Sequence, residues 1–251
     1  MDVVRRLRAA GCVFAEDEAR LLTEAAGSPA ELDELVAARV AGEPLEHLLG
    51  WAEFAGLRVA VTPGVFVPRR RTEFLAEQAA ALCQPGSVVL DLCCGCGAIG
   101  AAISAAVPGI ALHASDVDPA AVACARRNLP AAEVYEGDLF EPLPRSLRGA
   151  FDVVVANVPY VPTDEIDWMP VEARLHEPLS ALDGGADGLR FQRLLAGGAA
   201  EWLRPGGSLL VETSERQSPV SVDVFAGAGF AAEVRVCDER DSTVVVGVLA
   251  G

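Results

Sequence analysis

The sequence predicts an α/β fold in which helices cover a mostly parallel sheet, preceded by a small helical unit and a β-hairpin. Three observations support this prediction. From Thr72 onward, helical and strand-like segments alternate along the chain. The strand-like segments are nearly continuous apolar runs, which are typical of strands buried on both faces of a parallel sheet. Several of these runs end in polar residues, and ligands bind at the carboxyl edge of such sheets.

The segment before the sheet is expected to form two smaller units. Residues 1–50 carry helical periodicity, with Ser28 as an N-cap and Pro29 in the first helical turn. We therefore expect an N-terminal helical domain over these residues. Residues 51–71 contain two short alternating runs around Ala55–Gly56, which predicts a β-hairpin connector.

Residues 72–251 are expected to form the main domain around seven strands. One helix is predicted over 72–82, a second begins at Ala98, and a third covers 119–128. The last two strands are close enough in sequence to pair as an antiparallel hairpin. The seven predicted strands cover residues 87–92, 110–116, 132–138, 151–157, 207–213, 231–238 and 243–249.

Composition and charge argue against several classes of function. The net charge of −16 disfavours binding to duplex nucleic acid, because a protein that neutralises phosphates needs clustered basic side chains. Although 51% of the residues are hydrophobic, no apolar run approaches the roughly 20 residues of a membrane span. We therefore expect a cytoplasmic protein that binds no membrane. Its acidity favours basic protein partners.

The cysteines and histidines predict no metal site. The seven cysteines, an odd number, suit free thiols in a reducing compartment. Cys93, Cys94 and Cys96 lie too close together to match the usual spacing of zinc ligands. The 3 histidines are scattered along the chain without metal-like spacing, so no metal is expected.

A glycine-rich turn follows the first predicted strand, in "VVLDLCCGCGAIG". Asp91 ends the strand, and Gly95 and Gly97 let the backbone approach a ligand where the next helix begins. The turn lacks the Gly-Lys-Ser/Thr of a phosphate loop, so the ligand need not carry phosphate. About 20 residues further on, Asp116 offers a carboxylate that can accept hydrogen bonds from ribose hydroxyls. With Asp138 ending the third strand, the pattern predicts a nucleotide-like ligand.

Several sequence blocks occur in the order typical of one enzyme family. They are "GEPLEHLLG", "GVFVPRRRTE", "DLCCGCGAIG", "DVDPAAV", "GDLFEPL", "NVPY" and "HEPLSALDGGADGL". Together they resemble the HemK/PrmC-type protein-(glutamine-N5) methyltransferases, a class I S-adenosylmethionine-dependent family. The resemblance implies a Rossmann-like, seven-stranded, mostly parallel sheet and a helical domain that recognises the substrate. It also implies S-adenosyl-L-methionine as the cofactor and S-adenosyl-L-homocysteine as the product.

The resemblance assigns roles in cofactor binding to individual residues. It implies that Asp116 binds the ribose hydroxyls and that Asp138 and Leu139 meet the adenine. Asn157 is expected to touch both the cofactor and the substrate. The residues expected to bind the cofactor around the glycine turn are Asp91, Cys93, Cys94, Gly95, Cys96 and Gly97.

The block "NVPY", from Asn157 to Tyr160, is expected to hold the methyl acceptor. An amide nitrogen is a poor nucleophile because its lone pair is delocalised into the carbonyl, so hydrogen bonds must position it. The Asn157 side-chain oxygen and the Val158 carbonyl could accept its two N–H bonds. The resemblance implies that Tyr160 packs on the amide face and that Pro159 belongs to the same catalytic turn. Phe66 is expected to form a wall of the substrate slot.

Departures from the family pattern leave the acceptor open. Val158 replaces a proline, and Arg70 and Arg71 replace a proline and an acid. The family modifies a glutamine in a release factor or a ribosomal protein, so we expect a basic protein substrate and a monomeric enzyme. Two alternatives remain. One is N-methylation of a small-molecule amide or amine, and the other is a non-catalytic cofactor-binding scaffold.

Overall fold

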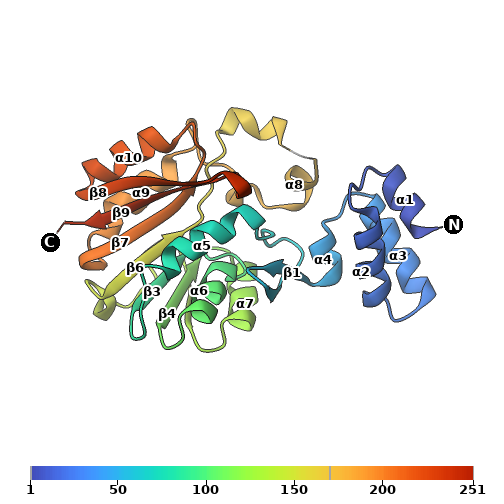
Figure 1. Cartoon of the computed structure of the whole chain (residues 1–251), viewed down its shortest axis with the longest axis horizontal. Helices are drawn as coiled ribbons and strands as arrows, with labels where there is room; N and C mark the ends of the chain where they lie inside the picture. Colours follow the sequence, from blue (N-terminus) through green and yellow to red (C-terminus); the bar gives the residue numbers. More distant parts are fainter. Residues whose placement is uncertain (1, 170, 251) are drawn as a thin grey trace.

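A seven-stranded sheet forms the centre of the main domain in the computed structural model, which describes residues 2–169 and 171–250 (Figure 1). Its strand order is β5-β4-β3-β6-β7-β9-β8. The first five strands are parallel, and β9 runs antiparallel to both of its neighbours. The predicted fold class and the C-terminal hairpin are therefore confirmed. The strands are β3 (Val88–Leu92), β4 (Ala111–Asp116), β5 (Glu133–Glu136), β6 (Phe151–Ala156), β7 (Leu203–Thr213), β8 (Phe230–Cys237) and β9 (Ser242–Leu249).

Two strands differ from their predicted limits. β5 ends at Glu136, so Asp138 lies in the turn after the strand instead of at its last position. β7 begins at Leu203, four residues earlier than predicted, and Leu203 pairs with Phe151. The register shifts between Phe151 and Val153. The "PGG" sequence, residues 205–207, thus lies at an irregularity inside β7.

Helices cover both faces of the sheet, as the apolar strands require. On one face lie α5 (Glu73–Ala80), α6 (Ala98–Ala106) and α7 (Pro119–Asn128), which pack against residues such as Val153 and Val155. On the other lie α9 (Arg190–Ala199) and α10 (Ser218–Gly227), which share a core with Val154 and Ala156. Alternate residues of β6 therefore serve the two cores, the period-two geometry of a strand.

The N-terminal helices lie to one side of the sheet and have a core of their own (Figure 1). They are α1 (Val3–Ala9), α2 (Ala15–Ala25), α3 (Pro29–Val40) and the short α4 (Leu45–Leu49). Leu7, Leu22 and Val36 are fully buried among them. Ser28 caps α3 by accepting a hydrogen bond from the Glu31 N–H, as its position before Pro29 predicts.

A hairpin connects these helices to the main domain. It consists of β1 (Trp51–Phe54) and β2 (Leu57–Ala60), which are antiparallel. Ala55 and Gly56 have φ values of 50° and 74°, so both turn residues are left-handed, as the tight turns of two-residue hairpins require. The hairpin packs on α6 and α7, because Asn128 donates a hydrogen bond to the Ala60 carbonyl and accepts one from the Ala60 N–H.

The connection between β6 and α9 is long and contains only short helices. These are η3 (Thr163–Trp168), α8 (Val171–His176) and η4 (Leu179–Ala181). A further short helix, η1 (Arg70–Thr72), precedes α5. Two more short 3₁₀ helices, η2 (Arg145–Leu147) and η5 (Asp238–Arg240), lie outside this connection. Among the residues that the structure describes, no helix has both the length and the apolar character to cross a bilayer.

Candidate active site

A cavity of about 580 Å³ lies at the carboxyl ends of β3 to β7. The chain order of the strands reverses between β3 and β6, and open α/β sheets bind ligands at this kind of switch point. The volume is within the range of sites for cofactor-sized molecules. Twelve of the predicted site residues line the cavity: Phe66, Cys93, Cys94, Gly95, Cys96, Asp116, Asp138, Leu139, Asn157, Val158, Pro159 and Tyr160.

The glycine turn after β3 is tied to the end of β4. The Gly95 N–H donates to Asp116 Oδ2 at 2.8 Å, and the Cys94 N–H donates to the Ser115 carbonyl at 3.1 Å. Gly95 is left-handed at φ +54°, and Cys93 adopts a similar φ of 57° without being glycine. Left-handed backbone is strained for a cysteine, and such strain clusters at ligand sites. The turn therefore holds its backbone close to the cavity.

Asp116 fits a partner for ribose hydroxyls. One carboxylate oxygen accepts the Gly95 N–H and the other accepts the Asp118 N–H at 2.9 Å. Because a carboxylate has about four acceptor positions, each oxygen keeps capacity for a hydroxyl. Burial raises the pKa of Asp116 above its usual value, although the hydrogen bonds to its carboxylate oppose this shift. A ligand that donates two hydrogen bonds would further stabilise the carboxylate.

The residues expected to meet adenine lie in the turn after β5. Asp138 is exposed and Leu139 is half-buried, and both line the cavity. Leu139 is left-handed at φ 45°, and its carbonyl accepts a hydrogen bond from the Ser115 hydroxyl at 3.2 Å. This contact holds an apolar side chain and an acid beside the Asp116 carboxylate, an arrangement suited to a flat heteroaromatic base.

Two residues predicted to bind the cofactor do not line the cavity. Asp91 is fully buried beneath the turn, where its Oδ2 accepts the Gly100 N–H at 2.8 Å. Burial raises the pKa of Asp91 to about 8, so its carboxyl group is largely protonated at neutral pH. Gly97 is also buried, and a Cβ there would come within 2.8 Å of the Leu129 side chain. Both residues shape the turn from below, because the strand end and the helix start need close packing.

The cysteines of the turn have the properties of packing groups. Burial raises the pKa of the Cys94 thiol, and it raises the pKa of Cys96 to about 12. Thiols in this state are protonated and unreactive. Among the side chains that the structure describes, no three from His, Cys, Asp or Glu are placed to hold a metal ion.

On the other side of the cavity, the Asn157 carboxamide is fixed by Thr72. Asn157 follows the last residue of β6, and its Nδ2 donates to Thr72 Oγ1 at 3.3 Å. Thr72 is buried at the junction of η1 and α5. Because this bond uses the amide nitrogen, the Asn157 Oδ1 remains an acceptor. Val158 is buried beside it, and its carbonyl lies past the end of the β6 ladder.

Tyr160 is held by a buried acid at the end of β7. Its hydroxyl donates to Glu212 Oε1 at 3.0 Å, and the Arg71 Nε donates to the same oxygen at 3.3 Å. Glu212 is only 1% exposed, whereas the Arg71 side chain is 45% exposed and lies 5.9 Å from the centre of the Tyr160 ring. Burial and the neighbouring Glu212 raise the pKa of Tyr160 well above its usual value, so Tyr160 stays a neutral hydrogen-bond donor.

Thr72 and Glu212 are not among the residues predicted from the sequence, and no role was predicted for Arg71. Glu212 carried a usable signal, because it is a charged residue at the end of an apolar strand, just as Asn157 is a polar one. Thr72 carried none, since a threonine before a helix usually indicates a cap. Its contact with Asn157 spans 85 residues of sequence.

The segment 65–69 lies between the N-terminal helices and the cavity. Arg69 forms a salt bridge with Glu177, whose side chain is almost fully buried. Phe66 lies under the Arg69 guanidinium at 4.9 Å. From α4, the His47 Nε2 lies 2.9 Å from the Val65 carbonyl oxygen. These contacts hold the segment 65–69 between the helices and the cavity wall.

Known proteins resemble this chain in both sequence and fold. Residues 56–186 match the family model described as the methyltransferase small domain. A protein of Geobacter sulfurreducens named release factor glutamine methyltransferase is 40% identical over 200 residues, which cover 78% of this chain and 69% of the relative. Proteins of the same name from Mycolicibacterium smegmatis and Streptomyces coelicolor are each 41% identical, over 80% and 73% of this chain and 72% and 67% of their own lengths.

Solved structures share the fold at lower identity. A methyltransferase from Pyrococcus furiosus aligns with a TM-score of 0.60 and 18% identity, covering 78% of this chain and 90% of its own. A T. thermophilus 16S rRNA methyltransferase aligns with a TM-score of 0.54 and 21% identity, covering 79% of this chain and 49% of its own. From its sequence relatives and its fold, the chain belongs to the release factor glutamine methyltransferase family, whose enzymes use S-adenosylmethionine as methyl donor.

Proposed function

We propose that the enzyme methylates the side-chain amide nitrogen of a glutamine in a release factor. One observation carries the proposal: Thr72 holds the Asn157 carboxamide by its nitrogen, which leaves the oxygen as an acceptor on the wall of the cavity. The same cavity is lined by the glycine turn and by Asp116. A donor site and an amide-holding site therefore share one space.

The contacts around the glycine turn support a binding site for the cofactor there. Cys93 to Gly95 would hold the methionine part, and Asp116 would accept hydrogen bonds from the two ribose hydroxyls. Asp138 and Leu139 take the adenine, and Asn157 lies where the cofactor and the substrate meet. When bound, S-adenosylmethionine supplies an electrophilic methyl group on a sulfonium sulfur.

The acceptor side positions a weak nucleophile. The Asn157 Oδ1 and the Val158 carbonyl accept the two N–H bonds of the glutamine amide, which turns the nitrogen lone pair toward the methyl group. The Tyr160 ring packs on the amide plane, and Glu212 holds that ring through its hydroxyl. Phe66 and Pro159 close the slot on either side. No strong base is required, because the nitrogen becomes very acidic once methylated and loses its proton readily.

Several features suit a protein acceptor better than a small amide. Leu179 lines the cavity and is 59% exposed, so apolar surface continues out of the site. Trp168, which is 86% exposed, lies next to Met169, which also lines the cavity. The helical unit over residues 1–50 serves as the substrate-recognition domain, with the hairpin over 51–71 as its connector. The net charge of −16 favours a basic partner. A monomeric, cytoplasmic enzyme fits these features and a substrate of the translation machinery.

The experiment is a labelling reaction with defined acceptors. The enzyme is incubated with methyl-labelled S-adenosylmethionine and a purified release factor, and the product is digested and mapped by mass spectrometry. We expect one methyl group on a glutamine side-chain amide, absent when that glutamine is replaced by glutamate. Label on a small amide from a metabolite extract, or on a ribosomal protein alone, would contradict the release factor as the acceptor. Cofactor binding without any labelled product would favour a scaffold.

A further inference from the structure

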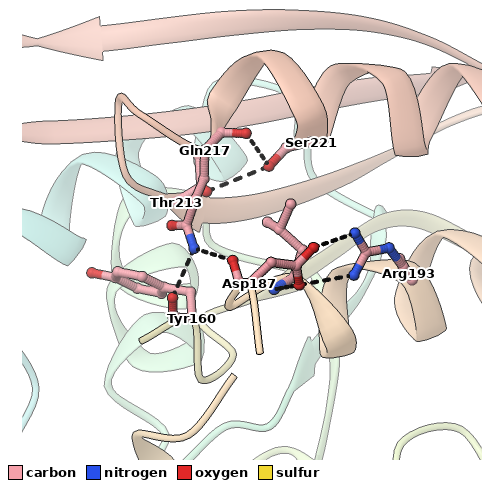
Figure 2. Close-up of polar contacts among 7 residues, drawn as sticks. Tyr160, Asp187, Arg193, Thr213, Gln217 and Ser221 are labelled. Atoms are coloured by element: carbon pink, nitrogen blue, oxygen red, sulfur yellow. Dashed lines mark hydrogen bonds and ion pairs between the residues drawn. The ribbon is translucent and has the colours of Figure 1, made fainter. Parts of the chain in front are cut away.

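The Gln217 side chain joins the catalytic turn to a distant loop (Figure 2). Gln217 lies directly before α10 and is only 6% exposed. Its Nε2 donates to the Tyr160 carbonyl at 2.9 Å and to the Asp187 carbonyl at 3.0 Å. Its Oε1 accepts the Ser214 hydroxyl at 2.6 Å. Both N–H donors and the oxygen of this amide therefore have partners, which fixes the orientation of the group.

Asp187 is itself fastened to α9. Its Oδ1 accepts the Leu189 N–H at 3.1 Å, and its carboxylate pairs with Arg193 at 2.6 Å, a contact that Figure 2 also shows. Gln217 thus joins three segments: the turn after β6, the loop before α9, and the turn between β7 and α10. The first of these carries Asn157 and Tyr160.

The glycines of the "GGADGL" block allow this loop to lie directly on the catalytic turn. A Cβ at Gly184 would come within 2.8 Å of the Pro159 carbonyl oxygen. A Cβ at Gly188, which has a φ of +74°, would overlap both the Tyr160 carbonyl oxygen and the Gln217 Nε2. Backbone bonds continue the contact, because the Gly184 N–H donates to the Val161 carbonyl at 2.8 Å. The glycines of this block therefore let its backbone pack directly against the turn after β6.

We propose that Gln217 is a positioning residue for methyl transfer, which it serves by holding the backbone at Tyr160 in place. The inference rests on the proposed role of Asn157 to Tyr160 as the acceptor clamp. Gln217 is itself buried, and its amide nitrogen donates one hydrogen bond to each of two carbonyls on separate segments. Without these two hydrogen bonds, nothing in the Gln217 side chain joins the turn after β6 to the loop before α9. A displacement of about 1 Å in a reacting geometry can cost a hundredfold in rate.

The test compares two buried glutamines exchanged for the similarly shaped methionine. In Gln217→Met, we expect kcat to fall about 10- to 100-fold, while the Kd for S-adenosylhomocysteine stays within about twofold. Hydrogen exchange should accelerate in peptides covering 157–163 and 183–190. The matched control is Gln192→Met on α9. Gln192 is fully buried, and neither polar atom of its side chain has a hydrogen-bond partner among the described residues, so kcat should stay unchanged.

A second variant separates positioning from general stability. Gln217→Glu keeps the shape but places a carboxylate against two carbonyl oxygens, so kcat should be lower than in the methionine variant near pH 8. It should recover partly as the pH falls, because a protonated glutamic acid can donate one hydrogen bond. A wild-type kcat in Gln217→Met, equal losses of kcat and cofactor affinity, or a glutamate variant without pH recovery would each overturn the proposal.

Failure of the proposed function gives a different result. In that case, the wild-type enzyme methylates no glutamine. The hydrogen exchange of residues 157–163 and 183–190 still tests whether Gln217 holds the two segments together, because that measurement needs no methyl acceptor. Faster exchange in Gln217→Met but not in Gln192→Met would support the proposed role of Gln217, and equal exchange in both variants would overturn it.

Discussion

The two sides of the cavity are built in different ways. On the cofactor side, backbone N–H groups of a tight turn and carboxylates at neighbouring strand ends make the polar contacts, as between Gly95 and Asp116. On the acceptor side, side chains from distant segments hold one another, as between Asn157 and Thr72 and between Tyr160 and Glu212. The cofactor side should therefore depend on few side chains, whereas the acceptor side should respond to many substitutions.

The largest expected effect concerns the acceptor side. Asn157→Ala removes the oxygen that we propose aligns the nucleophile, so kcat should fall at least about a hundredfold in the labelling reaction. The Kd for S-adenosylhomocysteine, measured by calorimetry, should change much less. Thr72→Val is the companion variant, because it removes only the hydroxyl that accepts the hydrogen bond from the Asn157 nitrogen, and kcat should fall less. Undiminished turnover in Asn157→Ala would remove the amide-clamp mechanism.

The next effect lies on the cofactor side. Asp116→Ala removes the proposed pair of charge-assisted hydrogen bonds to the ribose, which should weaken S-adenosylhomocysteine binding by about 1.5–3 kcal/mol, or about 10- to 150-fold in Kd. Calorimetry measures this directly. Asp223→Ala, on the exposed side of α10, removes the same charge away from the cavity and controls for net charge. Equal affinity in the wild type and Asp116→Ala would show that the ribose binds elsewhere.

A smaller effect should follow from Glu212→Gln. The substitution keeps the shape but removes the negative charge between the Tyr160 hydroxyl and Arg71. We expect kcat to fall about tenfold, or about 1.4 kcal/mol in the activation barrier, because the ring loses its charged partner. Tyr160→Phe removes the hydrogen bond that Glu212→Gln only weakens, so the loss in the double variant should be smaller than the sum of the two single losses. Additive losses would mean that the two residues act independently.

The smallest effect on turnover is expected from the packing beneath the glycine turn, whose consequence is instead a pH dependence of stability. The pKa of Asp91 is raised by burial to about 8 in the folded chain, against about 4 in the unfolded chain. Between these values the folded chain binds more protons, so stability falls as the pH rises, by at most about 1.4 kcal/mol per pH unit from this group. Asp91→Asn should flatten urea-unfolding free energies between pH 5 and about 8. An unchanged slope would show that Asp91 is ionised when folded.

The difference between the two sides also decides what the sequence could predict. The helix over 119–128 has its predicted limits, because Asp118 and Pro119 define its start locally. The glycine turn and Asp116 were likewise visible as local patterns after strands. The partnership of Tyr160 with Glu212 was not, because it joins strands β6 and β7 across 52 residues and depends on their neighbouring places in the sheet.

Two errors have the same physical origin. Asp91 was expected at the ligand because it ends an apolar run, but a strand residue can point beneath a turn as easily as toward the cavity. The fifth strand was expected to begin at Gly207, yet pairing of Leu203 with Phe151 makes it begin four residues earlier. In both places tertiary packing overrides a local pattern.

The contact between Gly188 and the Tyr160 carbonyl has a consequence for attempts to give the enzyme new acceptors. Any side chain at Gly188 would push against the turn that carries Asn157, so a library that varies the 184–188 loop would mostly yield inactive proteins. Exposed positions are better suited to such a library, because Arg70 and Trp168 are at the surface. Neither residue belongs to the turn 157–160 or to the contacts of Gln217. The search for altered acceptor choice should begin at those two residues.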